Sequence, residues 1–156
     1  MTVAQMPSEV ATRIFDLMSD NKTALLTSQG TLLYGDQNRI PTTPTLCVES
    51  GATARVLAGV GGRGRTENDL VCYLLLYWAK VDTNQKTKKD SELCAEAIAY
   101  YLDSNVTLER NGDGGIVIHG YVSSIEPGYS RRNEGSTLMY SVRLTWTGKS
   151  KTILGA

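Results

Sequence analysis

The sequence predicts an α+β fold, in which a mainly antiparallel β-sheet carries two principal helices packed on one face. Two segments, about residues 7–19 and 91–102, have the apolar spacing of amphipathic helices. The other apolar segments are short and bounded by Gly, Pro or Asn, which is typical of strands joined by turns. Strands connected by short turns pair mostly antiparallel, and their helices then cover one side of the sheet.

The first helix is predicted over about residues 7–19. Pro7 suits a first helical turn, with Met6 or Ser8 near the cap. Apolar side chains follow at helical spacing on one face: Val10, Ile14, Leu17 and Met18. Asp20 and Asn21 are expected to end this helix.

Three strands are predicted in the next forty residues. A short strand, Leu32–Tyr34, lies in a stretch rich in Thr, Gly, Pro and Asn, and a second strand covers Thr45–Glu49. After a turn at Ser50 and Gly51, the alternation of apolar residues over Ala52–Val60 predicts a third strand. A flexible, basic connection, residues 61–65, follows.

The run Leu70–Trp78 is apolar on both faces, so its periodicity does not separate a buried strand from a buried helix. Three consecutive leucines favour a helix. Two tyrosines, Trp78 and the strands that precede the run favour a central strand, which is our prediction.

The second helix is predicted over Ser91–Leu102, with Asp90 or Ser91 as its cap and Asn105 as its end. We expect one apolar stripe along it, formed by Leu93, Ala97, Ile98, Tyr101 and Leu102. Residues Val106–Glu109 are expected to extend into a strand, and the glycine-rich residues 111–115 to form a turn.

The C-terminal third is predicted to contain two strands separated by a loop. The first strand covers Ile116–Ile125, and the polar loop Pro127–Ser136 follows. The second strand, Thr137–Thr147, alternates clearly. Its apolar face holds Leu138, Tyr140, Val142, Leu144 and Trp146. Residues Gly148–Ala156 are expected to form a short basic tail.

Length and composition predict one globular domain over residues 1–156, with a short flexible N-terminus. Sixteen basic residues balance sixteen acidic ones, so the chain lacks the basic excess of tight nucleic-acid binding. The start of the chain does not have the pattern of a signal peptide. The longest apolar run, residues 70–79, is too short to span a bilayer, so no membrane partner is expected.

The three cysteines, Cys47, Cys72 and Cys94, are odd in number and form no Cys-x-x-Cys pair. This pattern argues against a disulfide framework or a zinc site and favours a reducing compartment. His119 is the only histidine, and no serine lies in a nucleophile-elbow pattern, so a structural or interface role is expected for it.

Two glycine patterns superficially suggest nucleotide binding. Gly59, Gly61 and Gly64 form G-x-G-x-x-G, with Asp82 about 20 residues later. A helix opening at the third glycine would place Glu67 and Asp69 in its first turn, where they would repel a pyrophosphate, so we favour a glycine-rich hairpin loop.

The second pattern, Gly148-Lys149-Ser150, resembles the end of a phosphate-binding loop. Arg143 stands where that motif needs its earlier glycine, and no helix-length segment follows. The sequence therefore predicts a protein without a catalytic, metal or cofactor site, which acts through contact.

Candidate contact residues lie in the two predicted loops and the basic tail: Arg63, Arg65, Tyr129, Arg131, Arg132, Lys149 and Lys151. Loop arginines of this kind serve protein interfaces more often than DNA phosphates. Most aromatic side chains are expected in the core, whereas Tyr129 is expected to be exposed, as interface tyrosines are.

The order of elements resembles that of the tail terminator and tail-completion proteins of long-tailed bacteriophages. The resemblance spans nearly the whole chain and is a pattern of elements without an invariant motif. It is carried by the first helix, the apolar strand 70–81, the helix running into NVTLE, and two segments, GGIVIHGYVSSIEPGY and STLMYSVRLTWTGKSKTIL.

The resemblance implies a compact α/β fold and a hexameric ring made in the host cytoplasm. Such a ring sits in the virion on the head-proximal end of the tail tube, stops the tube from growing and offers a docking surface to the neck. DNA would pass through its lumen without specific binding, and loops 61–68 and 127–136 would contact neighbours. Two alternatives are another ring protein (a head–tail connector or a tail-tube-like protein) and a small nucleotide-binding enzyme.

Overall fold

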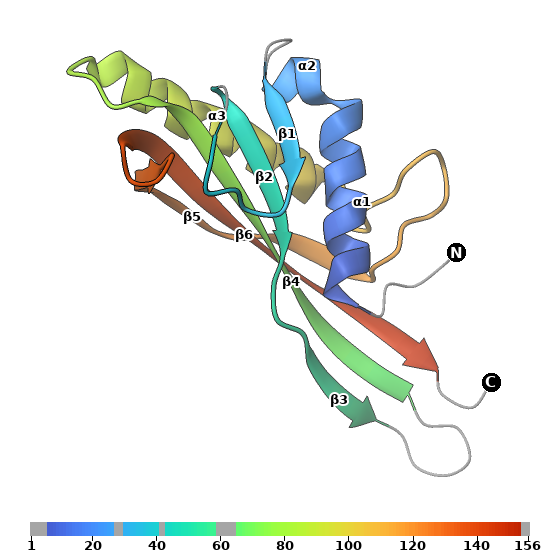
Figure 1. Cartoon of the computed structure of the whole chain (residues 1–156). Coiled ribbons are helices and arrows are strands. Elements are labelled where there is room, and N and C mark those ends of the chain that lie inside the picture. Colours follow the sequence, from blue (N-terminus) through green and yellow to red (C-terminus); the bar gives the residue numbers. More distant parts are fainter. Residues whose placement is uncertain (1–5, 27–29, 41–42, 59–64, 154–156) are drawn as a thin grey trace.

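A computed structural model describes residues 6–26, 30–40, 43–58 and 65–153, with the backbone alone at 56–58, 65–66 and 151–153. Figure 1 shows the arrangement of the helices and strands. In chain order they are α1 (Pro7–Asp20), α2 (Lys22–Leu25), β1 (Thr31–Tyr34), β2 (Thr45–Ser50), β3 (Ala54–Ala58), β4 (Arg65–Lys80), α3 (Gln85–Ser104), β5 (His119–Arg132) and β6 (Thr137–Ile153).

The strands form one six-stranded sheet in the order β1-β2-β4-β6-β5, and β3 pairs with the first part of β4. All pairs are antiparallel except β1 with β2, which are parallel. The predicted α+β class with a mainly antiparallel sheet is therefore confirmed.

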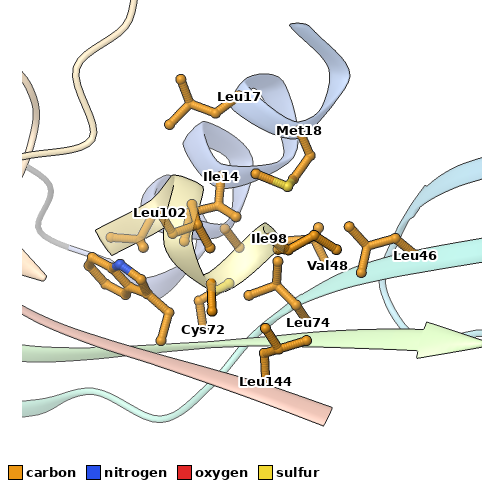
Figure 2. Packing of buried hydrophobic residues seen from close by; sticks show 14 of the residues in the cluster. Ile14, Leu17, Met18, Leu46, Val48, Cys72, Leu74, Ile98, Leu102 and Leu144 are labelled. Carbon is orange, nitrogen blue, oxygen red and sulfur yellow. The ribbon is translucent and has the colours of Figure 1, made fainter. Parts of the chain in front are cut away.

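The main core lies between one face of this sheet and the helices α1 and α3. Alternate residues of β4 and β6 point into it, including Leu74 and Leu144, because side chains of a strand alternate between its faces. Ile14 of α1 and Ile98 of α3 meet them there, as Figure 2 shows. Each fully buried side chain of this size stabilises the fold by roughly 1.5–3 kcal/mol.

A smaller core lies on the opposite face of the sheet. It consists of Ile40, Cys47, Tyr77 and Met139, all nearly or fully buried. Ile40 belongs to the connection between β1 and β2, so this connection crosses the face that the helices leave free.

The sheet extends beyond the helices as a three-stranded arm, made of β3, the first residues of β4 and the last residues of β6 (Figure 1). Polar side chains link its strands in addition to the backbone pairing. The Asn68 amide donates to the Ser150 hydroxyl at 3.2 Å, and the Arg55 Nε donates to the Asn68 carbonyl oxygen at 3.2 Å.

The predicted start of the second helix is wrong. α3 begins at Gln85, because the Asn84 side chain caps it by accepting from the Lys86 backbone N–H at 3.0 Å. The predicted stripe is wrong in part: Leu93 and Ala97 are exposed, and the buried side is Ser91, Ala95, Ile98, Ala99 and Leu102.

The predicted polar loop Pro127–Ser136 and the predicted tail are also wrong. β5 continues through Pro127 to Arg132, which is possible because β5 is an edge strand, and only residues 133–136 form a turn. β6 continues to Ile153 because its last residues pair with the start of β4, which places the backbone of Arg65 opposite Ile153.

Residues 106–109 form no strand. Leu108 is buried with a φ of 55°, and its carbonyl accepts from Arg13 at 2.7 Å. β5 starts at His119 rather than Ile116, since the backbone N–H groups of Ile116 and Val117 bond to Thr107 instead of a strand.

Candidate assembly interface

β5 forms one edge of the sheet and spans about 45 Å at its 14 residues. Three of its large apolar side chains are exposed: Tyr121 by 54%, Ile125 by 39% and Tyr129 by 55%. These apolar side chains alternate with exposed polar ones, so the edge has the mixed character that protein interfaces share with ordinary surface.

A bulge divides this edge between the two faces of the sheet. The register with β6 shifts between Val122 and Ser124. Tyr121 therefore lies on the face away from the helices, opposite Thr147, whereas Ile125 and Tyr129 lie on the helix side, opposite Leu144 and Tyr140.

The same edge is poorly suited to backbone pairing with another strand. Pro127 has no N–H group to donate, the bulge interrupts the ladder, and the Val122 N–H already donates to the Asp103 carboxylate at 2.7 Å. These features interrupt regular strand addition around Val122 and Pro127, so a contact there would rely mainly on side chains.

Tyr129, the exposed aromatic residue predicted from the sequence, lies near the turn of the β5–β6 hairpin. Its ring packs against that of Tyr140 with centroids 5.7 Å apart, and Lys88 Nζ of α3 lies 5.6 Å from its centroid. Arg131 is exposed and donates to the Gly135 carbonyl at 3.4 Å. Tyr129, Lys88 and Arg131 thus form one amphipathic corner.

Arg132 is half-buried and held by contacts within the chain. Its guanidinium donates to the Asp36 carboxylate at 2.8 Å and to the Tyr77 hydroxyl, and it stacks over the Tyr77 ring at 4.6 Å. The Tyr77 hydroxyl donates to Asp36 at 2.6 Å. Burial and, to a lesser degree, the nearby Asp36 carboxylate raise the pKa of Tyr77, so its hydroxyl stays protonated. Arg132 therefore pins the hairpin to the β1–β2 connection and leaves a partner little to contact.

The remaining predicted contact residues lie elsewhere. Lys149 is on β6, nine residues or about 30 Å along the strand from Tyr140, which faces Tyr129. Its ammonium group pairs with the Asp69 carboxylate at 3.5 Å. The backbone of Lys151 lies opposite Glu67, and that of Arg65 begins β4. Arg63 lies outside the described residues. The structure thus separates the predicted set between the hairpin turn and the arm.

The expectation that most aromatic residues lie in the core is only partly met. Tyr77, Tyr140 and Trp146 are buried, but Tyr100 and Tyr121 join Tyr129 in being more than half exposed. Sequence reasoning missed Tyr121 and Ile125 as surface residues. Their position on an edge strand becomes visible only when the strand order is known.

His119 is exposed and begins β5, so the mid-strand position expected from the sequence is wrong. With Tyr121, it lines a shallow hollow of about 350 Å³ on the face away from the helices. Lys149 and Asp69 also line this hollow, but they pair with each other. The described residues that line this hollow include no serine or cysteine.

The geometry also bears on nucleotide and metal binding. Gly59, Gly61 and Gly64 lie outside the described residues, but the chain from Arg65 is strand β4, not the helix that a dinucleotide fingerprint needs. Asp82 accepts from the backbone of Asn84 and from Thr87 and Tyr140 side chains, which fixes the start of α3. The described residues contain no cluster of three potential metal ligands.

A scan against protein-family models finds no match to this chain, and a search of curated proteins finds none either. Within the part of the chain that the structure describes, no helix is long and apolar enough to cross a membrane.

Proposed function

We propose that this chain is a non-enzymatic virion protein, a ring-forming tail terminator that caps the tail tube of a long-tailed bacteriophage and joins it to the neck. The observation that carries the proposal is the β5 edge, which exposes Tyr121, Ile125 and Tyr129 but is blocked against strand addition at Pro127 and at the bulge. Such an edge suits a defined contact between side chains.

The copies in a ring meet head to tail, so each copy needs two different surfaces. The rotation from one copy to the next must also bring the last copy back to the first. The β5 edge supplies one of these surfaces. The opposite edge of the sheet supplies the other, where β1 exposes Tyr34 by 46% and Phe15 of α1 packs edge-on against it at 6.1 Å. Each edge thus offers an exposed tyrosine, the residue type favoured at interfaces.

A zero net charge also supports the proposal. A channel through which DNA passes must not hold the DNA tightly, and binding to phosphates grows with each basic contact. On the helix-free face, Arg143 stacks over Tyr73 at 4.2 Å and is therefore engaged within the chain.

Imaging of the purified protein in negative stain tests the ring directly. We expect top views with six-fold symmetry, and we expect such rings to bind the end of purified tail tubes. Binding to the portal-side ring instead of tubes would assign the chain to the head–tail connectors. Particles without rotational symmetry at high protein concentration would contradict the proposal.

A further inference from the structure

The connection between α3 and β5 contains an exposed turn at Asn111 and Gly112. The φ angles of these two residues are positive, 54° and 73°, and the Asp113 backbone N–H donates to the Arg110 carbonyl at 3.2 Å. These features define a type I′ turn. In the amino-acid sequence, Asn111 is the only asparagine that is followed by glycine. The turn therefore places an asparagine side chain beside a backbone nitrogen that no neighbouring side chain of its own residue shields.

The peptide unit between Asn111 and Gly112 is free of internal hydrogen bonds. Within the described residues, the Asn111 carbonyl accepts none, the Gly112 N–H donates none, and the Asn111 side chain forms none. Both residues are exposed, and a Cβ atom at Gly112 would meet nothing within 4 Å. This peptide unit can therefore rotate without breaking a bond that holds the rest of the loop.

We propose that Asn111 is a site of spontaneous deamidation in the folded protein. The Gly112 backbone nitrogen loses its proton to hydroxide and attacks the carbonyl carbon of the Asn111 side chain. A new C–N bond closes a cyclic imide, the bond to the amide nitrogen breaks, and that nitrogen takes a proton and leaves as ammonia. Water then opens the imide at either carbonyl, which gives aspartate or isoaspartate. The reaction is intramolecular, so its two reacting groups are already held close together.

Asn133 shows which contacts prevent such a reaction. It also lies in a turn and has a similar φ, 57°. Its side-chain amide, however, is bonded at both ends. The carbonyl oxygen accepts from the Ile40 N–H at 2.8 Å, and the amino group donates to the Thr137 hydroxyl at 3.3 Å. An attack on this carbonyl carbon requires both hydrogen bonds to open first.

The neighbouring pair Asp113–Gly114 is also protected. The Asp113 carboxylate accepts from the backbone N–H groups of Gly115 and Arg110 and pairs with Arg13 at 2.7 Å. These contacts lower the pKa of Asp113 to about 2, so its carboxyl group is ionised and resists nucleophilic attack. Asn111 is therefore the reactive position in this turn.

The reaction changes the turn that connects the loop to α1. Arg110 pairs with Asp20 of α1 at 2.9 Å, and Asp113 pairs with Arg13 of α1. Either product adds a negative charge beside Asp113, and isoaspartate also adds a backbone atom between Arg110 and Asp113. The altered copies should therefore elute later than unmodified protein from an anion-exchange column, which gives a readout that is independent of mass.

This inference goes beyond the proposed function and does not depend on it. Asn111 lies outside the β5 edge, and freshly purified protein should form the proposed rings before Asn111 reacts. Failure of the rings and failure of the deamidation can therefore be told apart.

Peptide mapping by mass spectrometry measures the reaction. Trypsin cleaves after Arg110 and Arg131, and the peptide between them has Asn111 as its only asparagine. We expect this amide to convert to the acid when the native protein is incubated at pH 8, and to convert faster at higher pH. A zero-time sample corrects for conversion during digestion. An Asn111 that converts in guanidinium but stays unmodified in the native protein overturns the proposal.

Glu134→Gly supplies the matched control, because it places glycine after Asn133. Glu134 has a φ of 59°, which glycine adopts without strain, so the variant should fold. Asn133 is the only asparagine in the tryptic peptide that ends at Arg143. We expect Asn133 and Asn111 to convert at similar rates in guanidinium. In the folded variant, Asn133 should convert at least about tenfold more slowly, because its two hydrogen bonds must open first. Equal rates at the two sites in the folded variant overturn the inference.

Discussion

Gly120 of β5 and Gly148 of β6 face each other across the hairpin, and the indole ring of Trp146 lies over both. A Cβ atom on Gly120 would lie 2.8 Å from Cη2 of Trp146, and one on Gly148 would lie 2.8 Å from Cζ2. The fully buried indole is therefore accommodated only because two glycines are paired beneath it.

Gly120→Ala should lower the free energy of unfolding by at least about 2 kcal/mol, because the added methyl group overpacks a fully buried ring. Chemical denaturation measures this change. Gly128→Ala is the control in the same strand, where a Cβ meets nothing within 4 Å, and it should change stability by less than about 0.5 kcal/mol. Equal effects of the two substitutions would disprove the packing described here.

The ion pair between Asp36 and Arg132 should be strongly coupled to the stability of the fold. A double-mutant cycle of Asp36→Ala and Arg132→Ala is expected to give a coupling of about 1–3 kcal/mol, because both groups are mostly shielded and also bond to Tyr77. The matched cycle on Asp69 and Lys149, whose side chains are more than half exposed, should give less than about 1 kcal/mol. Similar couplings would mean that Arg132 does not pin the hairpin.

The three native thiols should react slowly in the folded protein. Burial raises the pKa of Cys47 and of Cys94 to about 11 and that of Cys72 to about 12, so almost no thiolate is present at pH 8. A colourimetric thiol reagent should label all three only after unfolding in guanidinium. Rapid labelling of the native protein would contradict the described burial.

The same pKa values predict an alkaline loss of stability. The folded pKa values of these thiols lie above 9.0, the ordinary value of a cysteine thiol, so this contribution to stability is fully present below pH 9 and is lost as the pH rises through about 11. Denaturation midpoints measured between pH 8 and pH 11 should therefore fall. Replacing Cys94 by Ala should make the fall smaller, whereas an unchanged slope would rule out a contribution from this thiol.

Ring formation should fail when the β5 edge is charged. Ile125→Lys combined with Tyr129→Lys places two charges at the contact, which costs several kcal/mol when both are desolvated. Both side chains are exposed, so thermal unfolding should change little. Val106→Lys, at an apolar residue of similar exposure outside β5, should leave rings intact. Rings that survive the double substitution would locate the contact elsewhere.

Sequence patterns were sufficient for the elements whose apolar spacing is regular. The helix from Pro7 and the strand from Thr137 are confirmed, because each buries one side of a regular repeat. The run from Leu70 is confirmed as a central strand, but it starts five residues earlier, at Arg65. Those added residues are polar, and only their pairing with β3 and β6 makes them strand.

The errors near β5 also arise because the strand order of the sheet cannot be read from the sequence. Pro127 and the polar residues after it are typical of a loop, and only the position of β5 at the sheet edge permits a strand there. For the candidate site, the sequence predicted Tyr129 and Arg131 as surface residues. It did not predict that Arg132 is engaged by Asp36, which is distant in sequence, or that Leu93 and Tyr100 form a stripe separate from the buried one.

The proposed capping role is tested by the length of tail tubes assembled from purified tube protein with and without this chain. We expect a six-fold ring on one end of each tube and an end to growth after the ring binds. Tubes that grow unchanged beside a monomeric protein that turns over a small molecule would contradict it.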